Sequence, residues 1–466
     1  MGWLRRGEAH AALVPTHAHF VGIAERGMTA LAQVLAESGA KVTGTDTTNQ
    51  ASLERLRRLG IHVHSGHAPA PFVQESDYVF VGTGAARIHP DRLRARRHGL
   101  REASPSRWLS HWMRGQVGLA VAGRRDASVS SAMIGWILTH AGLDPTVLVG
   151  MPAPQLGGWA RLGAGRHFVV EALEEDQELG PFGPRVAILL STVVSPNTTD
   201  LSARVSEIRR FATSVPADGL ILFESPNEVL EAAVHALEPT VESVSLTRGS
   251  SWWGADLREE RGRYRFRAFH EGHFTLEVGL QVPGRRNVLS AVAAVATCVQ
   301  LGVSTASIRE ALEEFTGVSR DFESRGSYQG VTLVDDEGRD PETIAETLAI
   351  GRQTFGSRRL RVVFWVDETD WTREDVGRYI SALSSADHVV LMDGNGTGTS
   401  RDLTESLVGD LAVSGVLANR VESFEGAIRY LDQHLEPGDV LITLGAGDVG
   451  TIADAFIRRL SRNRQG

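Results

Sequence analysis

The amino-acid sequence predicts an α/β protein built from three α/β units in series. Three observations support this prediction: short apolar runs recur along the chain, segments with helical spacing of apolar residues follow many of them, and glycine-rich turns join the two. A chain of 466 residues has room for about three domains of ~150 residues each. We expect domains at residues 1–117, 118–318 and 319–466.

The first unit opens with a strand–helix–strand pattern in residues 19–46, HFVGIAERGMTALAQVLAESGAKVTGTD. Apolar residues alternate up to Gly22, recur at helical spacing from Met28, and return in a strand that ends at Asp46. The segment YVFVGTGA (78–85) predicts a further buried strand with a glycine-rich exit. Such a βαβ unit is typical of dinucleotide-binding domains, whose ligands lie at the strand ends.

The second unit begins near Gly118 with the strand LAVAG, a polar loop and a helix from about Ser128. Further strands are predicted at HFVVEA, RVAILLST and DGLILFES, and a helix at LSARVSEIRRFATSV. The segment GRYRFRAFHEGHFTLEVGLQVPG alternates as a strand meander does. The small-residue-rich run RRNVLSAVAAVATCVQLG then predicts a helix closed by Gly302.

The third unit begins around TGVSRDFESRG. Its predicted strands are VTLVDDEG, LRVVFWVDE, HVVLMDG and DVLITLGAGD, and they alternate with helices such as PETIAETLAIGRQTF. This alternation predicts a third α/β unit with ligand positions at the strand ends.

Charge and composition exclude several classes of partner. The formal net charge of −9 provides no basic surface for nucleic acid or a membrane, so neither is expected. The sequence has no apolar run of the about eighteen residues that a spanning helix needs, and no secretory signal is evident. A single cysteine, Cys298, excludes an internal disulfide and a cysteine-based zinc site. We therefore expect a cytoplasmic protein.

Several short motifs, in their order and spacing, resemble the Mur ligase family, and within it the UDP-N-acetylmuramate–L-alanine ligases (MurC). They are HFVGIAERGM, GTD, GHAP, AGLDPT, VVEALEED, VPGRRNVLSAVAA, LVDDEGRDPETI and LITLGAGDVG. Each motif alone is a common turn, whereas the series runs from about His19 nearly to the end of the chain.

The resemblance implies a three-domain fold. It consists of an N-terminal Rossmann-like domain for a UDP-sugar, a central P-loop-type domain for ATP and magnesium, and a C-terminal Rossmann-like domain for the incoming amino acid. In the implied reaction the sugar carboxylate becomes an acyl phosphate, which the amine attacks. Such a site needs cations around the phosphates, backbone amides close to them, and an aligned nucleophile.

The phosphate loop of the family, G-T-H/N-G-K-T/S, departs from its pattern here and reads Gly123, Arg124, Arg125, Asp126, Ala127 and Ser128. The first and last residues are kept, so the turn from strand to helix is expected to persist. Asp126 places a negative charge where the family has glycine, and Ala127 replaces the lysine that contacts the terminal phosphates. Arg124 and Arg125 are substitute cations at less favourable positions. We expect that this loop no longer supports ATP hydrolysis.

The magnesium positions are also depleted. Glu171, in VVEALEED, matches a family glutamate and is the one candidate metal ligand. The family signature T-N-I-x-x-D-H aligns with LSTVVSP, where Pro196 replaces the histidine and has no ligand atom, and serines replace the other two polar residues. We expect neither ATP nor magnesium as a cofactor unless the site is rearranged.

Two further positions are implied near the nucleotide. Asn287, in GRRNVLSA, matches the family's asparagine beside the base, and Arg286 precedes it in place of a histidine. The other interpretation is that Asn287 caps the following helix. Arg320, in TGVSRDF, matches the first of two family arginines, while Asp321 replaces the second.

The C-terminal motifs change in the same way. DDYGHHP in the family reads DDEGRDP here: Asp335 and Asp336 are kept as substrate-binding candidates, while Arg339 and Asp340 stand where the histidines were. The family's QPHRYSR reads WVDETDW (365–371), in which acids replace the expected positive cluster.

The UDP-sugar turn of the family, G-x-G-G-x-G-M, reads GIAERGM. Gly22 and Gly27 permit a tight turn and a helix start that favours an anion, whereas Glu25 stands where the diphosphate would pass. Asp46 and His67 match family positions. These glycines, Asp46 and His67 are the candidates for binding a UDP-sugar or another anionic small molecule.

Three hypotheses follow. The first is a MurC-like protein without ligase activity that acts by binding or by protein assembly, linked to cell-wall precursor metabolism. The second is an active ATP-dependent amide-bond ligase with a rearranged site, in which Arg124, Arg125 and Glu171 handle the phosphates and metal. The third is a regulatory partner of an intact Mur ligase or of another protein of cell-wall synthesis.

Overall fold

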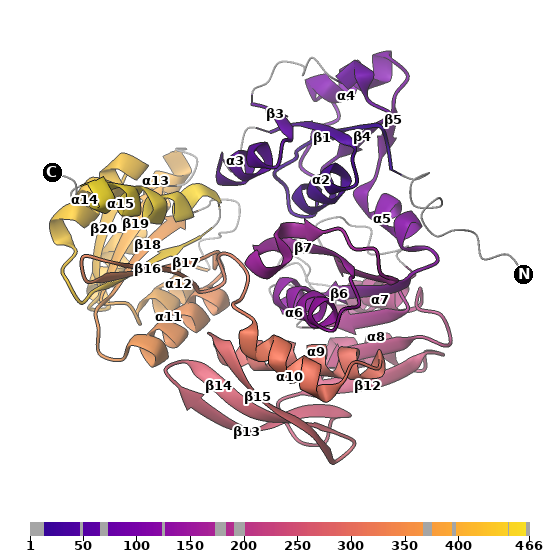
Figure 1. Cartoon of the computed structure of the whole chain (residues 1–466). Helices are drawn as coiled ribbons and strands as arrows, with labels where there is room; N and C mark the ends of the chain where they lie inside the picture. The colour runs from indigo at the N-terminus through magenta and orange to yellow at the C-terminus, as the bar shows by residue number, and fades with distance from the viewer. Residues whose placement is uncertain are drawn as a thin grey trace, which may run out of the picture. The chain divides into compact units, whose positions relative to one another are not determined.

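The computed structural model describes residues 14–46, 50–65, 73–123, 126–172, 183–190, 201–366, 375–393, 398–445 and 447–462. Its strands form three sheets of five, ten and six strands flanked by helices, which confirms the predicted α/β class (Figure 1). The chain divides into two compact units, one of residues 1–258 with 264–318 and one of residues 259–263 with 319–466. The division into three domains stays a prediction.

The first sheet is parallel, with strand order β3-β2-β1-β4-β5, the order found in dinucleotide-binding folds. Buried apolar side chains of α2 pack against the sheet and form its core. The elements are β1 (His17–Val21), α2 (Met28–Glu37), β2 (Lys41–Thr45), α3 (Gln50–Arg58), β3 (His62–His64), η1 (Val73–Glu75), β4 (Tyr78–Val81), α4 (Pro90–Arg97), β5 (Arg101–Ala103) and α5 (Pro105–Met113).

The second sheet combines parallel strands with the strand meander, in the order β15-β14-β13-β12-β11-β10-β6-β9-β7-β8. Its central strand β6 (Val117–Ala122) leads into α6 (Asp126–His140), which packs on α9 (Arg285–Gln300). The remaining elements are β7 (Thr146–Ala153), η2 (Pro154–Leu156), β8 (Gly158–Arg161), β9 (His167–Ala172), β10 (Val186–Leu189), α7 (Leu201–Ala212), β11 (Leu220–Glu224), α8 (Glu228–Val234), β12 (Thr240–Ser245), β13 (Trp252–Glu260), β14 (Arg263–His270), β15 (His273–Pro283) and α10 (Thr305–Glu314).

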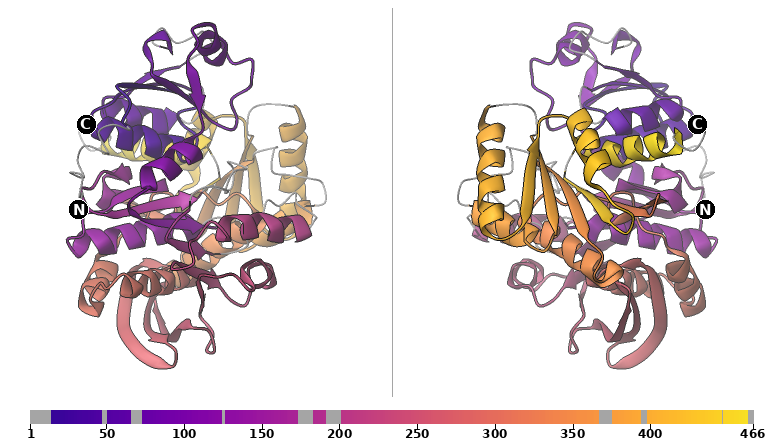
Figure 2. Two further views of the ribbon diagram at one scale, coloured as in Figure 1. Left: turned by 90° about the vertical axis from the view of Figure 1, so that its right-hand side faces the viewer. Right: turned by 90° about the vertical axis from the view of Figure 1, so that its left-hand side faces the viewer.

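The third sheet has the order β16-β17-β21-β18-β19-β20, and only its β16–β17 pair is antiparallel. Helices cover both faces: α11, α12 and α13 pack on one core and α14 and α15 on the other (Figure 2). The elements are β16 (Glu323–Tyr328), β17 (Val331–Asp336), α11 (Pro341–Phe355), β18 (Leu360–Val366), α12 (Val376–Leu383), β19 (His388–Asp393), α13 (Gly398–Val413), β20 (Leu417–Val421), α14 (Phe424–His434), β21 (Val440–Leu444), η5 (Gly447–Val449) and α15 (Gly450–Arg462).

A buried glutamine joins the first sheet's helix α2 to the edge strand β8 of the second sheet. The Gln33 side chain is 1% exposed; its Nε2 donates to the carbonyl of Ala160 at 2.7 Å, and its Oε1 accepts from the backbone N–H of Trp159 at 3.0 Å. One turn later, Glu37 accepts from the N–H of Leu162 at 2.8 Å. An edge strand has unpaired backbone groups, and here side chains of α2 bond to them.

Three of the four histidines that are buried among the described residues, His17, His167 and His388, are each at most 4% exposed. Burial lowers the pKa of all three below the ordinary histidine value, because a buried charge loses its hydration. For His167, neither ring nitrogen has a hydrogen-bond partner among the described residues. Burial in the folded chain therefore favours the neutral form of all three rings.

We expect the chain to lose stability as the pH falls below the ordinary histidine pKa of about 6.5. Because the folded-state pKa values are lowered, the unfolded chain binds protons first, and each histidine removes up to about 1.4 kcal/mol per pH unit. Above that pH the rings are neutral in both states and the full stability is present. Urea unfolding at a series of pH values measures this. His167→Leu should flatten the decline, and His98→Gln, at an exposed position, is the matched control.

Candidate functional site

The strand–loop–helix layout expected around the phosphate loop is present at the end of β6. Gly123 has a φ of +156°, and a side-chain Cβ there would lie 2.4 Å from the carbonyl oxygen of Leu190, so only glycine fits this approach. Helix α6 begins at Asp126, two residues before the predicted start at Ser128. Arg124 and Arg125, between Gly123 and the helix, lie outside the described residues.

Asp126 forms a two-point ion pair with Arg286 of helix α9. The Nε of Arg286 donates to Oδ1 of Asp126 at 3.0 Å, and its Nη2 donates to Oδ2. The Asp126 carboxylate is buried in the first turn of α6, where the helix dipole favours a negative charge. The helix start that would receive a phosphate therefore already holds a carboxylate with its own counter-ion.

The next two positions of the loop face the interior. Ala127 is fully buried in the core of the second sheet, so it contributes packing and no charge. The hydroxyl of Ser128 donates to Oε2 of Glu171 at 2.6 Å, and the same oxygen accepts from the N–H of Gly150 at 2.6 Å. Strands β7 and β9 thus bring Gly150 and Glu171 to the first turn of α6.

The described residues fit magnesium only in part and ATP poorly. Ser128 and Glu171 present two neighbouring oxygen donors of the kind that magnesium uses. No group of three or more metal-ligating side chains occurs among the residues that the structure describes. At the position of the terminal phosphates, Ala127 offers no cation and Asp126 repels an anion. No reaction step is assigned to ATP or magnesium here.

Asn287 does not cap helix α9 with its side chain. The helix begins after Gly284, which makes no side-chain cap, and the amide of Asn287 donates to the carbonyl of Pro283 at 2.7 Å. The capping interpretation is therefore wrong, because the amide nitrogen bonds to the preceding turn instead. Whether Asn287 contacts a base stays a prediction. Pro196 and the other residues of its motif lie outside the described residues.

Arg320 is integrated into the C-terminal unit. Its Nε donates to Oδ2 of Asp335 at 3.1 Å, and its Nη1 and Nη2 donate to the carbonyls of Gly447 and Gly445 at 2.9 and 2.6 Å. Burial opposes the charge on Arg320, but Asp335, Glu337 and Asp336 outweigh it and raise the Arg320 pKa. The predicted arginine and the glycine turn of the GAGDVG motif are therefore one hydrogen-bonded cluster.

Asp335 and Asp336, at the end of β17, both have internal partners. Asp335 accepts from the hydroxyl of Thr443 at 2.7 Å, and Asp336 accepts from the backbone N–H groups of Phe322 and Gly338 at 2.9 and 2.7 Å. Both side chains are at most 1% exposed. The structure therefore places these two predicted residues together with Arg320, in a buried network.

The two residues that replace the family histidines have local roles in the structure. Asp340 is the N-cap of helix α11 and accepts from the backbone N–H and the hydroxyl of Thr343 at 3.0 and 2.7 Å. The backbone carbonyl of Arg339 accepts from the hydroxyl of Tyr379 at 2.9 Å. The acidic segment 367–370 lies outside the described residues.

In the N-terminal turn, Gly22 and Gly27 have φ values of +83° and +74°, which favour glycine. Asp46 accepts from the backbone N–H of Ala24 at 2.8 Å and so holds the turn in place. Glu25 lies in the same turn, and His67 lies outside the described residues. The Gly-Thr-Gly exit of β4 was not predicted to lie beside this turn, although its two glycines were a visible signal.

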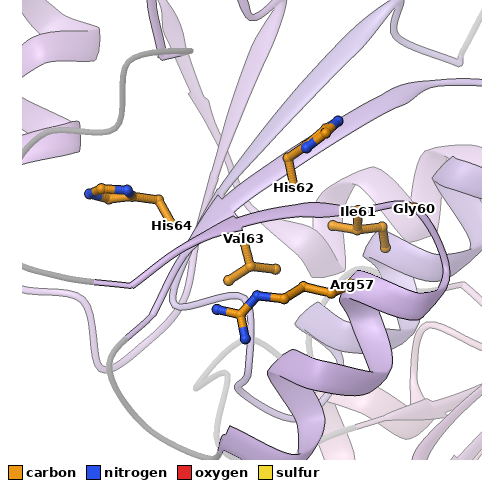
Figure 3. A pocket seen from close by; sticks show the side chains of 6 residues that line it. All are labelled: Arg57, Gly60, Ile61, His62, Val63 and His64. Atoms are coloured by element: carbon orange, nitrogen blue, oxygen red, sulfur yellow. The ribbon is translucent and has the colours of Figure 1, made fainter.

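A shallow pocket lies where α3 leads into β3, lined by Arg57, Gly60, Ile61, His62, Val63 and His64. Figure 3 shows the imidazoles of His62 and His64 well apart from one another rather than aimed at one point. Arg57 donates to the hydroxyl of Ser65 at 2.8 Å. The pocket is basic, but it presents no common metal or catalytic centre.

None of the helices in the described ranges is long and apolar enough to cross a membrane.

Comparison with known proteins identifies relatives over nearly the whole chain. A family model described as the Mur ligase family catalytic domain matches residues 17–117, and one described as the Mur ligase glutamate ligase domain matches residues 322–447. UDP-N-acetylmuramate–L-alanine ligases from Geobacter sulfurreducens and Anaeromyxobacter dehalogenans are 30% and 32% identical. They align over 96% and 95% of this chain, and over 98% of each relative.

Solved structures show the same fold. MurC from Thermotoga maritima superposes with a TM-score of 0.82 at 23% identity, over 96% of this chain and 99% of that one. A murein peptide ligase from Psychrobacter arcticus gives a TM-score of 0.75 at 23% identity, over 96% and 98%. The predicted Mur ligase architecture is confirmed, and this chain belongs to the Mur ligase family and is similar to MurC.

Proposed function

We propose that this MurC-like chain no longer carries out ATP-dependent ligation and acts by binding or by protein assembly, in connection with cell-wall precursor metabolism. The observation that supports the proposal most directly is the ion pair between Asp126 and Arg286. A triphosphate seated at the start of α6 would meet this carboxylate, and no lysine is present at Ala127 to offset the repulsion.

Several residues at family site positions, both substituted and retained, make contacts within the folded chain, which supports selection for the scaffold. Ala127 fills core volume, Asp340 caps α11, and Arg320 bonds to two backbone carbonyls of the same unit. These three residues at family site positions therefore have structural partners within the described chain. A scaffold maintained in this way suits a protein that presents a surface to a partner.

A second function, that of an active amide-bond ligase with a rearranged site, is favoured by the pair of Ser128 and Glu171. These oxygens are close enough to share one divalent cation. Arg286 would then have to leave Asp126 and turn towards the phosphates. The two candidates differ in one measurable respect, the release of ADP.

Purified full-length chain incubated with Mg-ATP, UDP-N-acetylmuramate and L-alanine tests the proposal. We expect ADP release no faster than the enzyme-free blank, with no ligated product by mass spectrometry. ADP release that depends on L-alanine would establish the active ligase instead.

A triple variant that restores the family's residues, Asp126→Gly, Ala127→Lys and Arg286→His, tests whether the loop residues are the cause of the proposed loss of ATP binding. We expect the Kd for Mg-ATP, measured by calorimetry, to fall at least about tenfold relative to the wild type. Arg285→His, one position earlier on the same helix and exposed, is the matched control. Equal affinity in all three proteins would show that the loop residues do not exclude the nucleotide.

A further inference from the structure

The turn after β1 and the turn after β4 form one cradle. The two strands are parallel neighbours, so their carboxyl ends lie at the same edge of the first sheet. Gly22 follows β1, and Gly82, Thr83 and Gly84 follow β4. Three glycines at this edge leave the backbone bare, as in the concave amide nests that bind anions.

The carboxylate of Glu25 lies within this cradle. A Cβ added at Gly82 would lie 2.4 Å from both carboxylate oxygens, and one added at Gly22 would lie 2.5 Å from Oε1. The corresponding distance at Gly84 is 3.2 Å. Side chains at Gly22 or Gly82 would therefore displace Glu25, so the two glycines and the carboxylate fit together.

Hydrogen bonds hold the carboxylate in this position. The hydroxyl of Thr83 donates to Oε2 of Glu25 at 3.3 Å, and the backbone N–H groups of Gly84 and Thr83 also donate to the side chain. Burial raises the pKa of Glu25, and nearby Asp46 adds to this, while the three donors lower it. Burial outweighs the donors, so the pKa of Glu25 is raised on balance, while the donors fix the position of the side chain in the cradle.

We propose that Glu25 is an internal occupant of this anion cradle and that it excludes nucleoside diphosphates from the N-terminal sheet of this chain. A diphosphate would need the same amides and the same space, and it would face the charge of Glu25 at contact distance. The inference goes beyond the proposed loss of ligation, because it concerns a different sheet and needs no ATP. In this proposal the side chain of Glu25 alone determines whether the turn admits a diphosphate.

Titration calorimetry with UDP as the probe, in the absence of ATP and magnesium, tests the inference. Glu25→Gly removes the side chain from the cradle. We expect the turn to keep its backbone conformation, since Gly22 and Gly27 already flank residue 25. We expect its Kd for UDP to be at least about tenfold lower than that of the wild type, a change of about 1.4 kcal/mol. Glu54→Gln removes one charge from exposed residue 54 of α3 and should bind UDP as the wild type does.

A second variant keeps the measurement decisive if Glu25→Gly does not fold. Glu25→Gln retains the shape of the side chain and removes its charge, so its Kd for UDP should lie between those of the wild type and the emptied cradle. Inorganic pyrophosphate in place of UDP should show the same order, because the cradle contacts the diphosphate rather than the base. Equal UDP affinity in the wild type and in the Glu25 variants, or no binding by any of them, would overturn the inference.

Discussion

Arg320→Met is expected to lower the free energy of unfolding of the C-terminal unit by about 3–5 kcal/mol, the range for breaking a buried ion pair by removal of one partner. The methionine keeps the length and apolar stem of the side chain and removes the guanidinium. Asp335, only 1% exposed, then loses its counter-ion and lies beside Asp336. Burial already raises the pKa of Asp335, so the variant should shift it further up.

The backbone adds to the effect. The carbonyls of Gly445 and Gly447 accept from Arg320 in the wild type and lose that donor in the variant. An unsatisfied buried acceptor costs about 1–3 kcal/mol, although the carbonyl of Gly447 lies at an exposed position, where water can replace the donor. The ion pair therefore accounts for most of the expected loss.

Urea unfolding followed by circular dichroism measures this change. Arg378→Met is the matched control, because Arg378 is 57% exposed and pairs with an exposed partner, for which about 0–1 kcal/mol is expected. The double variant Arg320→Met, Asp335→Asn should be less destabilised than the sum of its single variants, since no buried charge is left alone. An Arg320→Met protein as stable as the wild type would show that the arginine is not part of the fold.

The fold was predictable because buried parallel strands have their own sequence signal. The run LAVA is apolar at every position and VLITL at every position except Thr443, and the structure places both in strands buried on two faces. The meander at residues 262–284 was also visible as alternation, and the structure places strands β14 and β15 there. Strands β12 and β13, which join this meander to the rest of the ten-stranded sheet, were not predicted. Edge-to-edge joining of strands depends on tertiary packing rather than on local pattern.

The sequence was enough to predict which site residues differ from the family's motifs. It was not enough to predict which side chains those residues contact. That Asp126 and Glu25 were anomalous followed from the resemblance to the family's motifs, since each adds a charge to a turn that the resemblance implies binds phosphate. That Arg286 pairs with Asp126 across 160 positions, or that Thr83 bonds to Glu25, required the structure. The start of helix α6 was also predicted too late, at about Ser128 instead of Asp126, because Asp126 was interpreted as part of the loop.

Gln33 of helix α2 illustrates a contact with no sequence signal at all. It occupies a position in the middle of an amphipathic helix, where a polar residue predicts a solvated face. The structure instead buries it between the helix and strand β8, with its amide bonded to the backbone of Trp159 and Ala160. A side chain placed at Gly158, where φ is +141°, would lie 2.7 Å from Oε1 of Gln33. The side-chain amide of Gln33 therefore fills the space between helix α2 and strand β8 and bonds to the strand's backbone.

Gln33→Leu should consequently reduce the free energy of unfolding by about 3 kcal/mol, since two buried backbone groups lose their partners at about 1–3 kcal/mol each. Leucine has a similar volume, so the loss reports hydrogen bonding rather than a cavity. Thermal and urea unfolding measure it, and Gln300→Leu, at an exposed glutamine, should change stability by no more than about 0.5 kcal/mol. If amide exchange at Trp159 and Leu162 also accelerates, the contact between α2 and β8 opens before the sheets unfold. Unchanged stability and exchange would show instead that the edge strand is held without α2.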